Sequence, residues 1–162
     1  MQALENHIAD GTLDYQAAKV DPAITDATLD DFTAGYIVAG GQLSAPDSAP
    51  PEVRDRVAAL APYAEEFASC EGRSGWRAAW PTIFLDSCQA DLLSGALAAG
   101  ASVAGLAGLI TAETGAGPVV AEAIAGVLGF YGSLSMICNS WDTGIVIVYI
   151  PYPNILTCVP QQ

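Results

Sequence analysis

The chain has 162 residues, of which 52% are hydrophobic and 14% charged, and its formal net charge is -13. A chain this apolar offsets the entropy of ordering by burying a core, which excludes intrinsic disorder over its whole length. Its 18 acidic residues stand against only five Lys and Arg, too few to neutralise phosphates, so nucleic acid is excluded as a partner. Such an acidic excess keeps a protein soluble in strong salt, which indicates a halophilic or a high-GC source.

Residues 1–50 are expected to form an acidic helical N-terminal segment that ends in a linker. Leu29, Phe32 and Tyr36 recur at helical spacing, and Thr25 or Asp26 precedes them as a cap, which predicts a helix that stops at Gly40-Gly41. Residues 42–51 lack periodicity and end in two prolines, which predicts the linker. Residues 51–162 are then expected to form a second, disulfide-linked helical domain.

An aromatic and arginine-containing stretch follows a predicted helix whose apolar positions run from Val53 to Phe67. Trp76, Trp80 and Phe84 are four residues apart, and this spacing favours one buried helical face. The alternative is an anchor patch at an interface, because aromatic residues and arginines dominate binding surfaces. The interface candidates are Arg73, Trp76, Arg77, Trp80 and Trp141.

Two uncharged runs, residues 92–112 and 123–141, are joined by an acidic turn over residues 113–122. Each run is about as long as the stretch of roughly 20 apolar residues that a membrane-spanning helix needs. Pro118 suits the first turn of the second helix, so an antiparallel hydrophobic hairpin is expected over residues 92–138. Small residues along both runs predict close contact between helix backbones, at Gly95, Ala96, Gly100, Ala104, Gly108, Gly126, Gly129 and Gly132.

After the hairpin the pattern changes from helix to strand. Residues 145–150 form an unbroken β-branched and aromatic run, which predicts a strand, and residues 155–159 are expected to return as its partner. The predicted fold class is therefore mainly α: a helical bundle built around an antiparallel hydrophobic helical hairpin, with a short C-terminal β-ribbon over residues 144–159.

Four cysteines, at Cys70, Cys88, Cys138 and Cys158, lie at the edges of predicted elements, which favours crosslinks. Four cysteines allow three pairings, and we prefer Cys70 with Cys88 and Cys138 with Cys158 because each closes a loop of about 20 residues. Four buried free thiols remain the alternative. No metal site is expected, because there is no C-x2-C pair and His7 is the only histidine.

Catalytic residues and cofactor-binding motifs are not found: the chain has no G-x-S-x-G, no P-loop and no G-x-G-x-x-G after a strand. An enzyme is therefore the class that the sequence favours least, and no cofactor or small-molecule substrate is inferred. The first residues carry no secretion signal, so extracellular localisation implies a mature form or another export route.

The layout of an acidic leading half, a linker and a cysteine-bearing Gly/Ala-rich half resembles bacteriocin precursors and the halocin-type peptides of halophilic archaea. Gly40-Gly41 is similar to the double-glycine end of bacteriocin leaders, although Gly35 stands where such leaders have an apolar residue, and the chain is anionic. The resemblance implies an exported, non-enzymatic antimicrobial protein whose hairpin engages membranes, with residues 1–69 as leader or immunity-like cover.

Two other functions fit the same pattern. Uncharged hairpins with small-residue faces are also similar to pilin-like subunits of extracellular filaments. In such a filament, the strand over residues 144–150 of this chain would add to the edge of a neighbouring subunit. The third hypothesis is a soluble helical interaction domain. The expected partners are therefore membrane lipid or copies of the chain itself.

Overall fold

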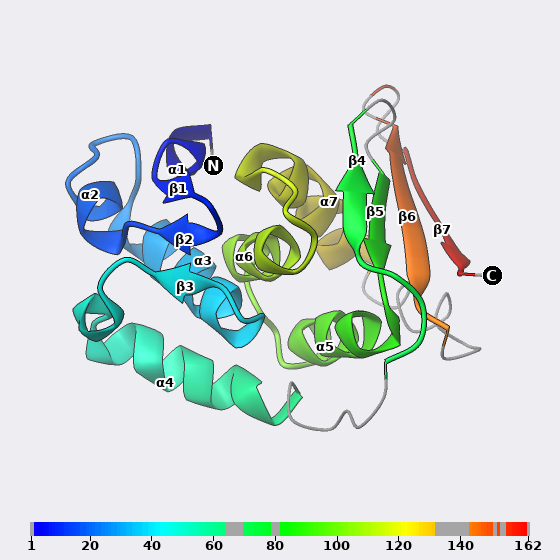
Figure 1. Ribbon diagram of the computed structural model, residues 1–162, viewed down its shortest axis with the longest axis horizontal. Coiled ribbons are helices and arrows are strands. Elements are labelled where there is room, and N and C mark those ends of the chain that lie inside the picture. Colours follow the sequence, from blue (N-terminus) through cyan, green and yellow to red (C-terminus); the bar gives the residue numbers. More distant parts are fainter. Residues whose placement is uncertain are drawn as a thin grey trace.

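The computed structural model describes residues 2–63, 70–78, 82–131, 143–150, 152 and 155–161. Within these residues the fold is mixed α/β, with helices packed beside a three-stranded mixed sheet and a four-stranded antiparallel sheet (Figure 1). The prediction of a mainly α bundle is therefore wrong. The C-terminal strands form no isolated ribbon, because residues 75–77 and 82–85 pair with them and extend them into a sheet.

The N-terminal part of the chain combines short strands with helices. Its elements are α1 Gln2–Glu5, β1 Ile8–Ala9, β2 Thr12–Leu13, α2 Tyr15–Lys19, α3 Asp26–Val38, β3 Gln42–Leu43, the 3-10 turn η1 Pro46–Ser48, α4 Pro51–Leu60 and the 3-10 turn η2 Ala61–Tyr63. The helix predicted after Thr25 is confirmed as α3, because the Thr28 amide donates to Thr25 Oγ1 at 3.3 Å. The predicted linker over residues 42–51 contains β3, which pairs in parallel with β2.

The C-terminal part supplies the larger sheet and the most apolar helices. Its elements are β4 Gly75–Arg77, β5 Thr82–Leu85, α5 Ser87–Ala98, α6 Val103–Thr114, α7 Pro118–Tyr131, β6 Ile145–Ile150 and β7 Ile155–Pro160. The strand predicted over residues 145–150 is confirmed as β6. The sheet order is β4-β5-β6-β7, with antiparallel neighbours throughout, so β6 is an interior strand and β7 an edge strand.

The first uncharged run is divided between two helices, which corrects its prediction as one long helix. α5 ends at Ala98, Gly100 takes a φ of 77°, and α6 begins at Val103. Ser102 caps α6, because its Oγ accepts a hydrogen bond from the Gly105 amide at 3.1 Å. A glycine in the left-handed region followed by a capping serine therefore outweighs the apolar pattern.

Within the part of the chain that the structure describes, no helix combines the length and the hydropathy required to cross a lipid bilayer.

Helix α6 lies at the centre of one hydrophobic core. Leu106, Leu109 and Ile110 are buried, α3 and α7 pack against α6, and β5 and β6 contribute buried isoleucines from one sheet face. The crossing of α3 and α6 is a backbone contact, because a Cβ atom at Gly35 would overlap the carbonyl oxygen of Gly105. The segments expected as residues 1–50 and 51–162 thus share this core.

Candidate functional site

The four-stranded sheet is distinguished by its lack of acidic residues. Among the 18 acids of the chain, none belongs to β4, β5, β6 or β7, and Arg77 is the single charged residue in these strands. The sheet therefore forms a nearly uncharged region in a molecule with a net charge of -13. A neutral region is where such a molecule meets another surface with the least repulsion.

One face of this sheet packs on the helices, and the opposite face carries apolar side chains towards the surface. On the helix side, Ile83, Ile145 and Ile147 are fully buried. The register places Phe84 beside Val146, and Val146 beside Val159, on the opposite face. Since side chains alternate along a strand, this second face, which we call the outer face, is β-branched and aromatic.

Two arginines flank the aromatic ring of the outer face. The Arg73 Cζ lies 4.0 Å from the ring centroid of Phe84, and the Arg77 Cζ lies 6.0 Å from it. Both arginines are exposed, so each guanidinium keeps donors available to solvent or to a partner. The last two positively charged residues of the chain thus lie beside an apolar sheet face.

Among the described strands the sheet has two edges, β4 and β7, and β7 forms the edge beside the C-terminus. Two of its outer-face side chains are large and exposed, with exposed fractions of 46% for Ile155 and 54% for Val159. Figure 1 shows β7 at the margin of the molecule, next to the C-terminus and separated from β5 by β6. No strand among the described residues pairs with its outer edge, which leaves backbone donors and acceptors at that edge for another chain.

The predicted interface residues are only partly brought together. Arg73 precedes β4, and Trp76 and Arg77 belong to it, but Trp76 pairs with Ile83 and so faces the helix side of the sheet. Trp80 and Trp141 lie outside the described residues. The helical spacing of Trp76 and Phe84 is coincidental, because they belong to two antiparallel strands, and Phe84 takes the central place on the outer face.

A glutamine near the C-terminus organises this surface and was missed by sequence reasoning. Gln161 is only 7% exposed. Its Nε2 donates to the carbonyl oxygens of Arg73 and Leu85, both at 2.8 Å, and its Oε1 accepts from the Arg73 amide at 2.9 Å. The terminal Gln-Gln dipeptide gave no signal of burial.

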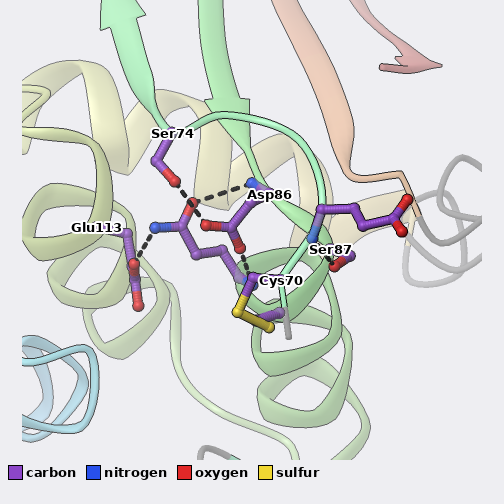
Figure 2. Close-up of a disulfide and its surroundings, with 8 residues drawn as sticks. Cys70, Ser74, Asp86, Ser87 and Glu113 are labelled. Carbon is purple, nitrogen blue, oxygen red and sulfur yellow. Dashed lines mark hydrogen bonds between the residues drawn. A yellow bond between two sulfur atoms is a disulfide. The ribbon is translucent and has the colours of Figure 1, made fainter. Parts of the chain in front are cut away.

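The disulfide preferred on loop length, Cys70–Cys88, is present, with 5.3 Å between its Cα atoms (Figure 2). Cys70 is exposed, and Cys88 is buried in the first turn of α5. Beside it, Ser74 Oγ donates to Asp86 Oδ2 at 2.8 Å, and the Glu71 amide donates to Ser87 Oγ at 2.9 Å. Cys158 is also disulfide-bonded, whereas Cys138 lies outside the described residues, so the second pairing stays a prediction.

A half-buried acid lies across a small cavity of about 230 Å³ from this disulfide. Burial raises the pKa of Glu113 to about 7, an effect that is opposed by the hydrogen bond from Gln89 Nε2 and increased by the charge of Asp86. Gln89 also completes a capping box with Asp86 at the start of α5. The acidic turn predicted around Glu113 is therefore the last turn of α6, facing α5.

Metal-type donors converge at one place among the described residues: Cys70, Asp86 and Cys88. Both sulfur atoms belong to the disulfide. A disulfide sulfur is not a thiolate, and the thiolate is the form that binds a metal. The arrangement is therefore a crosslink.

The residues predicted to pack helices together have different positions. Gly108 lies under the Phe32 carbonyl of α3, and Ala96 is buried, but Gly100 terminates α5 and a Cβ at Gly126 would meet nothing within 4 Å. Gly95 and Ala104 are half-buried, Gly129 falls within α7, and Gly132 lies outside the described residues. The sequence thus correctly predicted that small residues of this region make close helix contact. The helix that they contact is α3, and Gly35 of α3 was not predicted to take part.

No family model, no curated protein and no solved structure matches this chain.

Proposed function

We propose that this chain is an exported, non-enzymatic structural protein whose copies associate through the β4–β7 sheet, with β7 of one copy adding to β7 of another. The observation that carries the proposal is the absence of acids from a sheet whose free edge is exposed. Export is supported by the Cys70–Cys88 disulfide, since such bonds persist in oxidising compartments.

A second copy fits the free edge better than an unrelated strand does. Natural edge strands avoid pairing through charged residues, prolines, bulges or cover. β7 has no charged residue, and its proline, Pro160, is its last residue. Two copies related by a twofold axis present the same strand to each other in antiparallel orientation, so one exposed edge satisfies the other. The strand expected to add to a neighbour was residues 144–150, but β6 is paired on both sides, and β7 takes that role.

Net charge determines the conditions under which copies meet. Two molecules of charge -13 repel each other at low ionic strength. Salt shortens the screening length from about 10 Å at 0.1 M to about 3 Å at 1 M, which weakens that repulsion but leaves apolar and backbone contacts intact. Association is therefore expected to strengthen as salt is added, the opposite of an interface built on ion pairs.

Sedimentation velocity at both salt concentrations tests the proposal. The wild-type chain is expected to shift towards dimers or larger species in high salt, and Val159→Lys is expected to prevent the shift by placing a charge on the outer face of the edge strand. Val20→Lys is the matched control, because Val20 is 82% exposed at the end of α2. A wild-type monomer in high salt, or equal loss of association in both variants, would rule the proposal out.

The bacteriocin-like function stays a separate prediction. Its hairpin corresponds to α5, α6 and α7, and the apolar side chains of α6 are buried against α3 and α7. Engagement of lipid through this hairpin therefore requires α6 to leave the core. Dye release from neutral and anionic liposomes measures that activity directly, and the Val159→Lys variant is expected to behave like the wild type in that assay.

A further inference from the structure

Three donor atoms meet at the start of α5. The Sγ atoms of Cys70 and Cys88 and a carboxylate oxygen of Asp86 all lie within 4.8 Å of one another (Figure 2). The two cysteines have a sequence separation of 18, so no short motif links them. In the disulfide form this group is a crosslink, and reduction of the disulfide leaves two thiols beside a carboxylate.

The spacing of the three donors suits a zinc ion. Zinc binds thiolate sulfur at about 2.3 Å and carboxylate oxygen at about 2.1 Å, so two ligand atoms of a tetrahedral site lie about 3.6 to 3.8 Å apart. The Cα atoms of Cys70 and Cys88 are 5.3 Å apart. Once the bond between the sulfurs is broken, rotation of the cysteine side chains can separate the two Sγ atoms to the distance that zinc requires.

Asp86 is held in place by neighbours that leave it able to bind a cation. Its Oδ2 accepts from Ser74 Oγ at 2.8 Å, and its Oδ1 accepts from the Gln89 amide at 2.9 Å. A carboxylate has about four acceptor positions, so each oxygen keeps one for a metal ion. Hydrogen bonds of this kind orient the ligands of metal sites, and their loss weakens metal binding.

The surroundings of the donors favour a positive charge. Cys70 is exposed, and the cavity of about 230 Å³ adjoins the group, which gives an ion a route from solvent. Among the described residues that line this cavity, Asp86 and Glu113 are acidic and none is Lys, Arg or His. Two thiolates beside these acids repel one another, and a divalent cation removes that repulsion.

The donor types distinguish zinc from the other common divalent cations. Thiolates select zinc and similar soft ions, whereas calcium and magnesium take oxygen ligands. Two thiolates and one carboxylate fill three of the four tetrahedral positions. Water fills the fourth, as in zinc sites with three protein ligands.

We propose that the reduced form of this chain binds one Zn²⁺ through Cys70, Cys88 and Asp86. A dithiol supplies two electrons and two protons to the disulfide, so both cysteines become thiols and the dithiol becomes a disulfide. Zn²⁺ then displaces the two thiol protons, which pass to water. The cysteine pair therefore has a zinc-bound state in a reducing compartment and a crosslinked state in an oxidising one. Sheet-mediated association does not involve these residues, so either proposal stands if the other fails.

Cobalt titration of the full chain tests the proposal, because Co²⁺ replaces Zn²⁺ in tetrahedral thiolate sites and absorbs visible light there. The chain is first reduced with a phosphine, which is then removed in the absence of oxygen. One Co²⁺ per reduced chain is expected to give the absorption bands, and Zn²⁺ is expected to displace it. The oxidised chain is expected to give no bands.

Two variants separate this site from other metal binding. The double variant Cys70→Ala and Cys88→Ala is expected to give no bands after reduction, although it keeps Cys138 and Cys158 as thiols. Asp86→Asn removes the carboxylate and keeps a side chain that caps a helix well. It is expected to weaken cobalt binding about tenfold or more, since even the groups that orient a metal ligand have effects of that size.

Glu71→Gln is the matched control, because Glu71 is an exposed acid next to Cys70 in the sequence and does not belong to the group of three donors. It is expected to leave the cobalt affinity within about twofold, as one surface charge contributes little. Thermal unfolding provides a second readout: Zn²⁺ is expected to raise the unfolding temperature of the reduced wild type and of Glu71→Gln, but not that of the double cysteine variant. The proposal is overturned by the absence of cobalt bands in the reduced wild type, by equal bands in the double cysteine variant, or by equal weakening in Asp86→Asn and Glu71→Gln.

Discussion

Gln161 and Arg73 exchange two hydrogen bonds although 88 residues separate them in the chain. The Gln161 side chain both accepts from the Arg73 amide and donates to the Arg73 carbonyl, and the same Nε2 donates to the Leu85 carbonyl. One side chain therefore joins the end of β7 to the segment before β4 and to the end of β5. These hydrogen bonds hold the backbone of Arg73, whose side chain lies over the Phe84 ring.

Gln161→Ala is expected to lower the free energy of unfolding by about 2 to 4 kcal/mol, because buried backbone groups lose their partner. Gln16→Ala is the control, since the Gln16 side chain makes one exposed hydrogen bond of 3.5 Å. Urea denaturation of both variants measures the difference. Equal effects would show that the Gln161 side chain contributes no more than a surface glutamine.

Local features were predictable from the sequence, and long-range pairing was not. The capped helix α3 and the strand β6 follow from patterns within a dozen residues, and both appear where expected. The partners of β6 are β5, about 60 residues earlier, and β7, and nothing in the residues of β5 indicates that partner. Four-residue spacing in residues 76–84 also mimics a helix period, which concealed two short strands.

In the candidate sites, too, local features were predictable from the sequence and long-range contacts were not. The arginines were identified from residue type and the disulfide from loop length, but the position of the arginines beside Phe84 depends on β-sheet register. The β1–β2, α3–β3 and α6–α7 turns line one cavity of about 490 Å³, and each carries a glycine that is readable from the sequence as a turn residue. The packing of α3 across α6 requires glycine at Gly35 and Gly108, because a Cβ atom at either position would overlap a backbone carbonyl oxygen of the facing helix.

The α3–α6 crossing provides a test with opposite expectations for two glycines. In Gly108→Ala a methyl group would overlap the Phe32 carbonyl, so the helices must separate, and stability is expected to fall by about 1 to 3 kcal/mol or more. In Gly126→Ala the methyl group enters open space on α7, so stability is expected to rise by about 0.5 to 1 kcal/mol from helix propensity. Thermal or urea unfolding compares the two variants, and a loss in both would contradict the close backbone contact as the cause.

The Cys70–Cys88 crosslink is expected to contribute about 3 kcal/mol, because it closes a loop with a sequence separation of 18. The double variant Cys70→Ala and Cys88→Ala removes it without disturbing Cys158. Chemical denaturation under non-reducing conditions measures the loss. Peptide mass mapping of the wild type, also without reductant, checks the pairing, and a fragment linking Cys70 to Cys158 would refute it.

Glu113 gives the folded protein a specific dependence on pH. Burial raises its pKa from 4.5 to about 7, so between these values the folded chain holds a proton that the unfolded chain has released. The free energy of unfolding therefore falls as pH rises through this window, and above about pH 7 the buried carboxylate keeps its full desolvation cost. Below the unfolded pKa both states are protonated, and the contribution disappears.

Glu113→Gln replaces the acid with a neutral group that still accepts from Gln89. The variant is expected to match the wild type near pH 4 and to exceed it near pH 8 by on the order of 2 kcal/mol, because it has no ionised form to desolvate. Glu52→Gln, on the exposed first turn of α4, is the control and is expected to show no such divergence. Urea unfolding of the three proteins at both pH values provides the measurement. Parallel curves for Glu113→Gln and the wild type would mean that Glu113 is solvated as an ordinary surface acid, and burial between α5 and α6 would then not be the cause of its raised pKa.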